Sequence, residues 1–301
     1  MTPFLDPQVR SPHLISDSNI FFLALCSSTW TVRIGALVNT PSNVSSGPEP
    51  LAEAIDRVEK YNEIPRLLSQ ALVDGLSIEG AGEALSIGAA GLFLRSQTGN
   101  PMDVHMHTSA NLRRWLLKLD GLSRRNRMLI LLLWHTGPEV MSTQYRMEPT
   151  VQPDAAAVAA LPHRSQEDLL EAITHSIHHQ PPTDWSTVTN LGKMIVVPEV
   201  KDTVHLAQQY VNLRYDPDVL INRLAEIVCH DSFTEMHAFK HHQAIFEEFY
   251  ATREPWRWMH LVCGAQAAAI SFGKNMEVFE DALDLMHAYP GSGSGVAIAA
   301  E

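Results

Sequence analysis

The chain has 301 residues, 45% of them hydrophobic and 19% charged, a composition typical of a soluble globular protein that buries a real core. Its formal net charge of −12 argues against nucleic acid or an anionic membrane as the main partner, because phosphate binding needs clustered Lys and Arg. The three cysteines, Cys26, Cys229 and Cys263, form no Cys-x-x-Cys pair, so a disulfide framework is not expected and a reducing cytoplasm is predicted.

Residues 1–50 are predicted to form an irregular arm and a linker. The start of the chain lacks the basic segment of a signal peptide, and 40–50 (TPSNVSSGPEP) has the composition of a loop. Residues 20–38 are apolar, but Arg33 and several hydroxyl side chains interrupt them. They therefore indicate a buried segment rather than a membrane span.

Helical patterns dominate residues 51–289. The spacing predicts a helix over 51–72 that Pro65 breaks or kinks, a helix opened by Ser77 that runs through 83–94, and helices over 104–119 and 128–134. The proline- and alanine-rich stretch 148–162 is expected to be a surface excursion, and a capping signal at Ser165 opens a helix over 165–179.

Helices follow one another closely after residue 202. They are predicted at 203–213, 217–229, 233–251, 255–272 and 275–288, while 194–197 is an isolated β-branched run. Residues 290–301 have the chemistry of a flexible tail or of an appended linker. The fold class is therefore predicted to be all-α, with one multi-helix domain over 51–289; a division near 145–165 is the alternative.

Histidines are concentrated late in the chain. Six of the 15 lie between His205 and His260, several of them in apolar helical segments. Two i,i+4 pairs, Glu226 with His230 and His237 with His241, would each present ligands on one helix face. Ser232 opens a capping box, so the two pairs would belong to consecutive helices that meet at a corner. This spacing predicts a metal or acid–base site.

A partial pattern of the HD metal-binding superfamily overlaps the same region. His205, His230-Asp231 and either Asp281 or Asp284 follow the order of the ligands in that family. Its members are helical metallophosphohydrolases or, in a minority, di-iron oxygenases. Taken together, the two patterns make the following residues metal-ligand candidates: His205, Glu226, His230, Asp231, His237 and His241. Few basic side chains lie near them, which disfavours a nucleotide substrate.

A third pattern recurs at the predicted helix starts, where an apolar residue precedes a histidine and an amide residue follows about two turns later. The segments Val104-His105 to Asn111, Met236-His237-Ala238-Phe239-Lys240 and His260-Leu261-Val262 resemble questin-oxidase-like proteins, which are helical oxidases of aromatic polyketides. The expected histidine-rich motif near the N-terminus is missing. The resemblance implies His105, His237 and His260 as catalytic residues and reduced nicotinamide (NADPH) as electron donor.

The favoured hypothesis is a metal-assisted oxidoreductase, with iron or manganese, acting on a hydrophobic and aromatic small molecule. An HD-type phosphohydrolase, a metal-free acid–base enzyme and a non-enzymatic protein with structural or pH-responsive histidines are the alternatives. A small-molecule substrate is expected as the partner, without nucleic acid or membrane, and self-association is left open.

Overall fold

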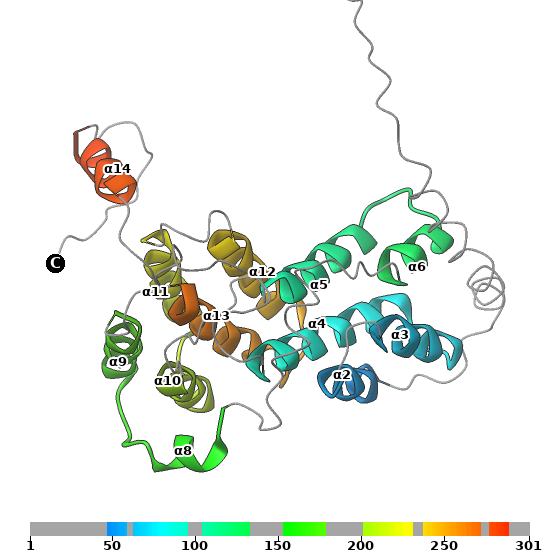
Figure 1. Ribbon diagram of the computed structural model, residues 1–301, viewed down its shortest axis with the longest axis horizontal. Helices are drawn as coiled ribbons and strands as arrows, with labels where there is room; N and C mark the ends of the chain where they lie inside the picture. Colours follow the sequence, from blue (N-terminus) through cyan, green and yellow to red (C-terminus); the bar gives the residue numbers. More distant parts are fainter. Residues whose placement is uncertain are drawn as a thin grey trace, which may run out of the picture. The chain divides into compact units, whose positions relative to one another are not determined.

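The computed structural model describes residues 47–58, 63–95, 104–132, 153–178, 201–230, 237–271 and 277–288. Within these ranges the chain forms α-helices and no strand, which confirms the all-α expectation (Figure 1). All of these residues belong to one compact unit, Ser42–Glu301. No helix in the described ranges is long and apolar enough to cross a membrane.

The first group of helices packs around α4. Besides α4 (Ile78–Arg95), the group comprises α2 (Glu49–Asp56), α3 (Ile64–Val73), α5 (Val104–Leu117) and α6 (Arg124–Leu132). Each of the other four helices contacts α4. Pro65 divides the predicted 51–72 helix and occupies the first turn of α3, where its missing N–H costs nothing.

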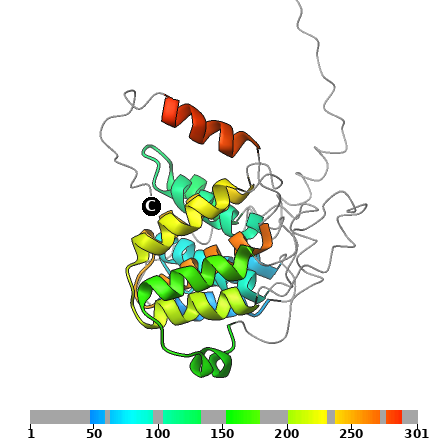
Figure 2. The ribbon, with the colours of Figure 1, turned by 90° about the vertical axis from the view of Figure 1, so that its left-hand side faces the viewer.

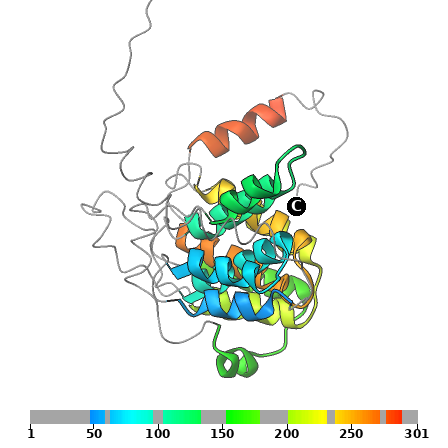
Figure 3. The ribbon, with the colours of Figure 1, turned by 90° about the vertical axis from the view of Figure 1, so that its right-hand side faces the viewer.

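Helix α4 is apolar on all sides and is buried along nearly its whole length. The hydroxyl of Ser77 accepts a hydrogen bond from the backbone N–H of Gly80 at 2.9 Å and so caps the helix start. Gly88 and Gly91 let α2 come close, and Figure 3 shows α2 lying along α4. A Cβ atom on Gly88 would lie 2.5 Å from Cγ2 of Ile55.

The second group packs around α13 (Trp258–Ser271), which is also apolar and buried on all described sides. Helix α13 contacts α4 of the first group and four helices of the second. These are α9 (Gln166–His178), α10 (Lys201–Asn212), α11 (Pro217–Cys229) and α12 (His237–Ala251). Helices α9 and α10 run side by side (Figure 2). Because α13 joins both groups, helices on the two sides of 145–165 share one core.

Helix α12 also contacts α5, so the two groups meet along a second seam. The turn between α12 and α13 is tied to α4 by a buried carboxylate. Glu83, 7% exposed, accepts hydrogen bonds from the backbone N–H of Arg253 at 2.9 Å and from its guanidinium at 2.7–3.1 Å. This ion pair holds the turn before α13 against α4.

Some expectations differ from the structure. Part of the expected excursion at 148–162 is a short helix, α8 (Ala155–Ala160), because the Asp154 side chain caps the N–H of Ala157. Cys229 is exposed at the end of α11, although it follows an apolar run that would suggest a core thiol, whereas Cys263 is buried. A last helix, α14 (Glu277–Ala288), follows α13. The 1–46 arm, the 194–197 run, the Ser232 capping box and the 290–301 tail lie outside the described residues.

Candidate functional site

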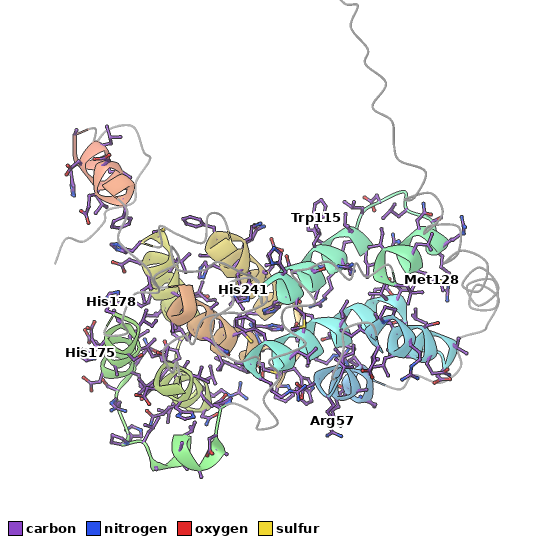
Figure 4. All side chains as sticks on the ribbon, viewed as in Figure 1. Arg57, Trp115, Met128, His175, His178 and His241 are labelled. Atoms are coloured by element: carbon purple, nitrogen blue, oxygen red, sulfur yellow. The ribbon has the colours of Figure 1, made fainter. Side chains whose placement is uncertain are left out.

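Three buried histidines from three different helices meet where α5, α12 and α13 come together. His107 of α5 is 0% exposed, His241 of α12 is 1% exposed, and His260 of α13 is 0% exposed. Nδ1 of His107 lies 3.2 Å from Nε2 of His241, and Nε2 of His107 lies 2.9 Å from Nδ1 of His260. Figure 4 labels His241 on α12.

The contact chain continues to Thr252, in the turn after α12. The Thr252 hydroxyl lies 3.2 Å from Nε2 of His260, the nitrogen that points away from His107. We call the sequence of contacts from His241 through His107 and His260 to Thr252 the histidine row. Every ring-to-ring contact in it is at hydrogen-bond distance.

The histidine row is uncharged. Burial and, to a smaller extent, the nearby charge of Arg114 together lower the pKa of His107 to about 3. Burial is also the main cause that holds the pKa values of His241 and His260 well below the usual histidine value, with the neighbouring ring of His107 adding to both. A low-dielectric interior disfavours the protonated ring. At neutral pH each ring therefore has one N–H donor and one bare nitrogen acceptor.

A buried ion pair continues the network beyond Thr252. Arg114 forms an ion pair with Glu248, and their side chains are only 11% and 2% exposed. Nη1 of Arg114 also donates to the Thr252 hydroxyl at 3.1 Å. The Glu248 carboxylate accepts from the hydroxyl of Ser86 at 2.6 Å and from the amide of Asn111 at 3.1 Å. Burial of a carboxylate is expensive, and these partners offset its cost.

Arg114, Glu248 and Asn111 also form the floor of an open groove between α5 and α12. Its volume is about 660 Å³. The aromatic side chains at the groove are unusually exposed: Trp115 52%, Tyr250 49% and Phe246 45%. Trp115 is labelled in Figure 4. The complete lining is Asn111, Arg114, Trp115, Lys118, Phe246, Glu247, Glu248, Tyr250 and Ala251.

Of the predicted catalytic set, the described residues place one member in the histidine row. His260 lies in the histidine row, but the α5 member of the row is His107 and not the predicted His105, which is half-buried. The side chain of His237 lies outside the described residues. A signal for His107 is present in the sequence, because His107, Asn111 and Arg114 are spaced i, i+4 and i+7 on one helical face.

Of the predicted metal ligands, His241 alone is placed in the row by the described residues. His205 accepts from the backbone N–H of Asp154 at 3.3 Å, beside α8. Glu226 is exposed on α11, and the ring of His230 packs on Phe279 of α14 with 3.7 Å between centroids. Asp231 lies outside the described residues.

The arrangement of the row also bears on metal binding. In the described part of the chain, no group of three or more His, Cys, Asp or Glu side chains is placed to hold a metal ion. The reason is visible at His107, which turns opposite ring nitrogens toward its two histidine neighbours. Three nitrogens facing one point would need a different orientation of that ring. As they are arranged, the three histidines do not fit a shared ion.

The site thus defines an all-helical protein with a buried, uncharged histidine row behind an aromatic-lined groove. Comparison of the chain with family models, with curated proteins and with solved structures gave no match.

Proposed function

We propose that this chain is an oxidoreductase whose substrate is a hydrophobic, aromatic small molecule bound in the groove between α5 and α12. The observation that carries the proposal is the histidine row, joined to the groove floor through Thr252 and Arg114. Titratable groups with strongly shifted pKa values next to a groove are typical of functional sites.

The redox class comes from the questin-oxidase-like resemblance. Its three segments fall on α5, α12 and α13, and these helices supply the three histidines of the row. Two of the segments contain His107 and His260, which are neighbours in the row, and the third ends one residue before His241. That convergence supports the resemblance, which implies insertion of oxygen into an aromatic or quinone substrate, with NADPH as electron donor.

The groove offers the matching recognition chemistry. Trp115, Phe246 and Tyr250 can cover the faces of an aromatic ring, and such contacts account for much of the affinity for aromatic ligands. Arg114 on the floor supplies N–H donors for an oxygen substituent, and Lys118 adds an exposed positive charge. A planar, oxygen-bearing aromatic molecule suits these walls and this floor.

The proposal retains a divalent metal, iron or manganese, as a cofactor that would activate dioxygen or polarise the substrate. We assign no step to it, because the described histidines do not face a common point. The chain's own residues would hold the substrate at the floor, and the neutral rings behind it would keep protons at defined nitrogens.

One observation favours a second function. None of the three histidines lines the groove, and their hydrogen-bond contacts are with one another and with Thr252. The row would then be a structural network in a non-enzymatic binding protein, since buried polar groups that are fully paired also stabilise a unique core. Nothing comparable favours the phosphohydrolase alternative, because His205 and His230 have separate partners.

The experiment compares purified wild-type protein with His107→Gln. Each protein is incubated with NADPH, dioxygen and a panel of phenols, naphthols and quinones, and oxygen uptake and products are measured. We expect turnover by wild type and a loss of about a hundredfold or more in the variant, as for removal of an acid–base group. The matched control is His175→Gln, an exposed histidine of α9 labelled in Figure 4.

Elemental analysis of protein purified without a metal-affinity tag decides the cofactor. Iron or manganese at one equivalent supports the metal-assisted form of the proposal. Wild-type protein that binds members of the panel in the groove but converts none of them would refute the oxidoreductase and favour the binding protein.

A further inference from the structure

The hydrogen-bond roles along the histidine row can be worked out from its Thr252 end. A guanidinium has only donors, so the Thr252 oxygen accepts from Arg114. The hydroxyl still has one hydrogen to donate. Among the described residues, Nε2 of His260 is the acceptor that the structure places within reach of that hydrogen.

The first assignment determines the others. If Nε2 of His260 accepts, the hydrogen of that neutral ring must be on Nδ1, where it faces Nε2 of His107 at 2.9 Å. His107 then accepts at Nε2 and donates from Nδ1 to Nε2 of His241 at 3.2 Å. The remaining hydrogen of the row is on Nδ1 of His241.

The reversed arrangement meets an obstacle at the same end. With hydrogen on Nε2 of all three rings, both Arg114 and His260 would donate to the Thr252 oxygen. The hydroxyl hydrogen would then have no acceptor within the described part of the chain. A buried donor without a partner is the more costly outcome. The positive charge of Arg114 also disfavours a second N–H pointing toward it.

We propose that Arg114 and Thr252 are positioning residues that fix all three histidines in the Nδ1–H tautomer and so give the row one direction. At the end of the row opposite Thr252, Nδ1 of His241 is then an N–H donor rather than a basic nitrogen. A role for this donor in catalysis rests on the proposed function. The tautomers themselves are a property of the resting protein.

The arrangement also makes the three tautomers interdependent. If His107 moved its hydrogen to Nε2, that hydrogen would face the hydrogen on Nδ1 of His260. On the other side, two bare nitrogens, Nδ1 of His107 and Nε2 of His241, would face each other. The tautomer of each ring therefore constrains the tautomer of the next, and the three tautomers change together. Arg114 sets this direction from the groove floor, because it contacts Glu248 and Thr252 at once.

The test is nitrogen-15 NMR of protein labelled in its histidine rings, with resonances assigned by single His→Gln variants at the three positions. Two-bond nitrogen–hydrogen correlations distinguish Nδ1–H from Nε2–H rings. For wild type we expect the Nδ1–H form to exceed the other by about tenfold or more in all three rings, given the cost of an unmade buried hydrogen bond. A wild-type spectrum with Nε2–H as the main form in any of the three would overturn the inference.

A matched pair of variants tests the source of the direction. Thr252→Ser keeps the hydroxyl and should keep the wild-type tautomers. Thr252→Val has nearly the same shape without the hydroxyl, and we expect it to give mixed tautomers in all three rings. Unchanged tautomers in Thr252→Val would refute the role of Thr252. If Thr252→Val does not fold, the spectra of wild type and Thr252→Ser still test whether the three rings are in the Nδ1–H form.

The failure of the proposed function would look different. A protein with the expected tautomers that converts no member of the aromatic panel would keep this inference and lose the oxidoreductase. Turnover by a protein whose row contains Nε2–H rings would support the oxidoreductase and refute the tautomer inference.

Discussion

The stability of the protein should fall steeply in mild acid because of the buried histidines. The pKa of His107 is about 3 in the folded chain and 6.5 in an exposed histidine. Below pH 6.5 the unfolded chain therefore binds a proton that the folded ring does not bind, and the free energy of unfolding decreases as the pH falls. The stability provided by the neutral ring is fully present above pH 6.5.

The magnitude follows from the separation of the two pKa values. At 1.36 kcal/mol for each pKa unit, lowering the pH to 5 costs about 2 kcal/mol through His107 alone. His241 and His260 contribute with the same sign, because burial also lowers their pKa values. A loss of this size is a large fraction of the stability of an ordinary domain.

Urea unfolding at pH 7.5 and at pH 5.0, followed by circular dichroism, measures the effect. Wild type should lose more free energy of unfolding between the two pH values than His107→Gln, by about 2 kcal/mol. The exposed His175→Gln should behave as wild type. Equal pH dependence in wild type and His107→Gln would refute the reasoning, because it would mean that the His107 ring is protonated in the folded protein.

Three further predictions concern the helices around the site. Gly88→Ala should lower the free energy of unfolding by about 1–3 kcal/mol, since the new Cβ would overlap Ile55; thermal melting measures this, and an unchanged melting temperature would contradict the close approach of α2. Glu248→Gln should cost about 3 kcal/mol in urea unfolding by leaving buried Arg114 without its counter-charge, whereas the exposed Glu254→Gln should cost less than about 1 kcal/mol. Trp115→Ala should weaken binding of an aromatic ligand, measured by calorimetry, without lowering the melting temperature, because that side chain is 52% exposed; equal binding would exclude it from the site.

The sequence predicted the fold class well, because apolar periodicity and capping residues are local. Pro65 marks the start of α3, and Ser77 caps α4 as its position suggests. The predicted ligand pair Glu226 and His230 shows where periodicity could have been used further. The buried residues of α11 form one stripe, and Glu226 lies on the opposite, exposed face.

The histidine row could not be predicted in the same way. His107 is separated from His241 by 134 residues and from His260 by 153, so their contact depends on how three helices rotate against one another. Sequence spacing orders residues within one helix and leaves that rotation open. The choice between His105 and His107 required knowing which face of α5 meets α12.

The Glu83–Arg253 ion pair joins α4 to the turn before α13, across 170 positions of the sequence. Contacts at such separations form slowly, because a long loop must close before they stabilise anything. A nascent chain that ends before α13 holds His107 without its His260 partner. The histidine row is therefore complete only after α13 has been synthesised.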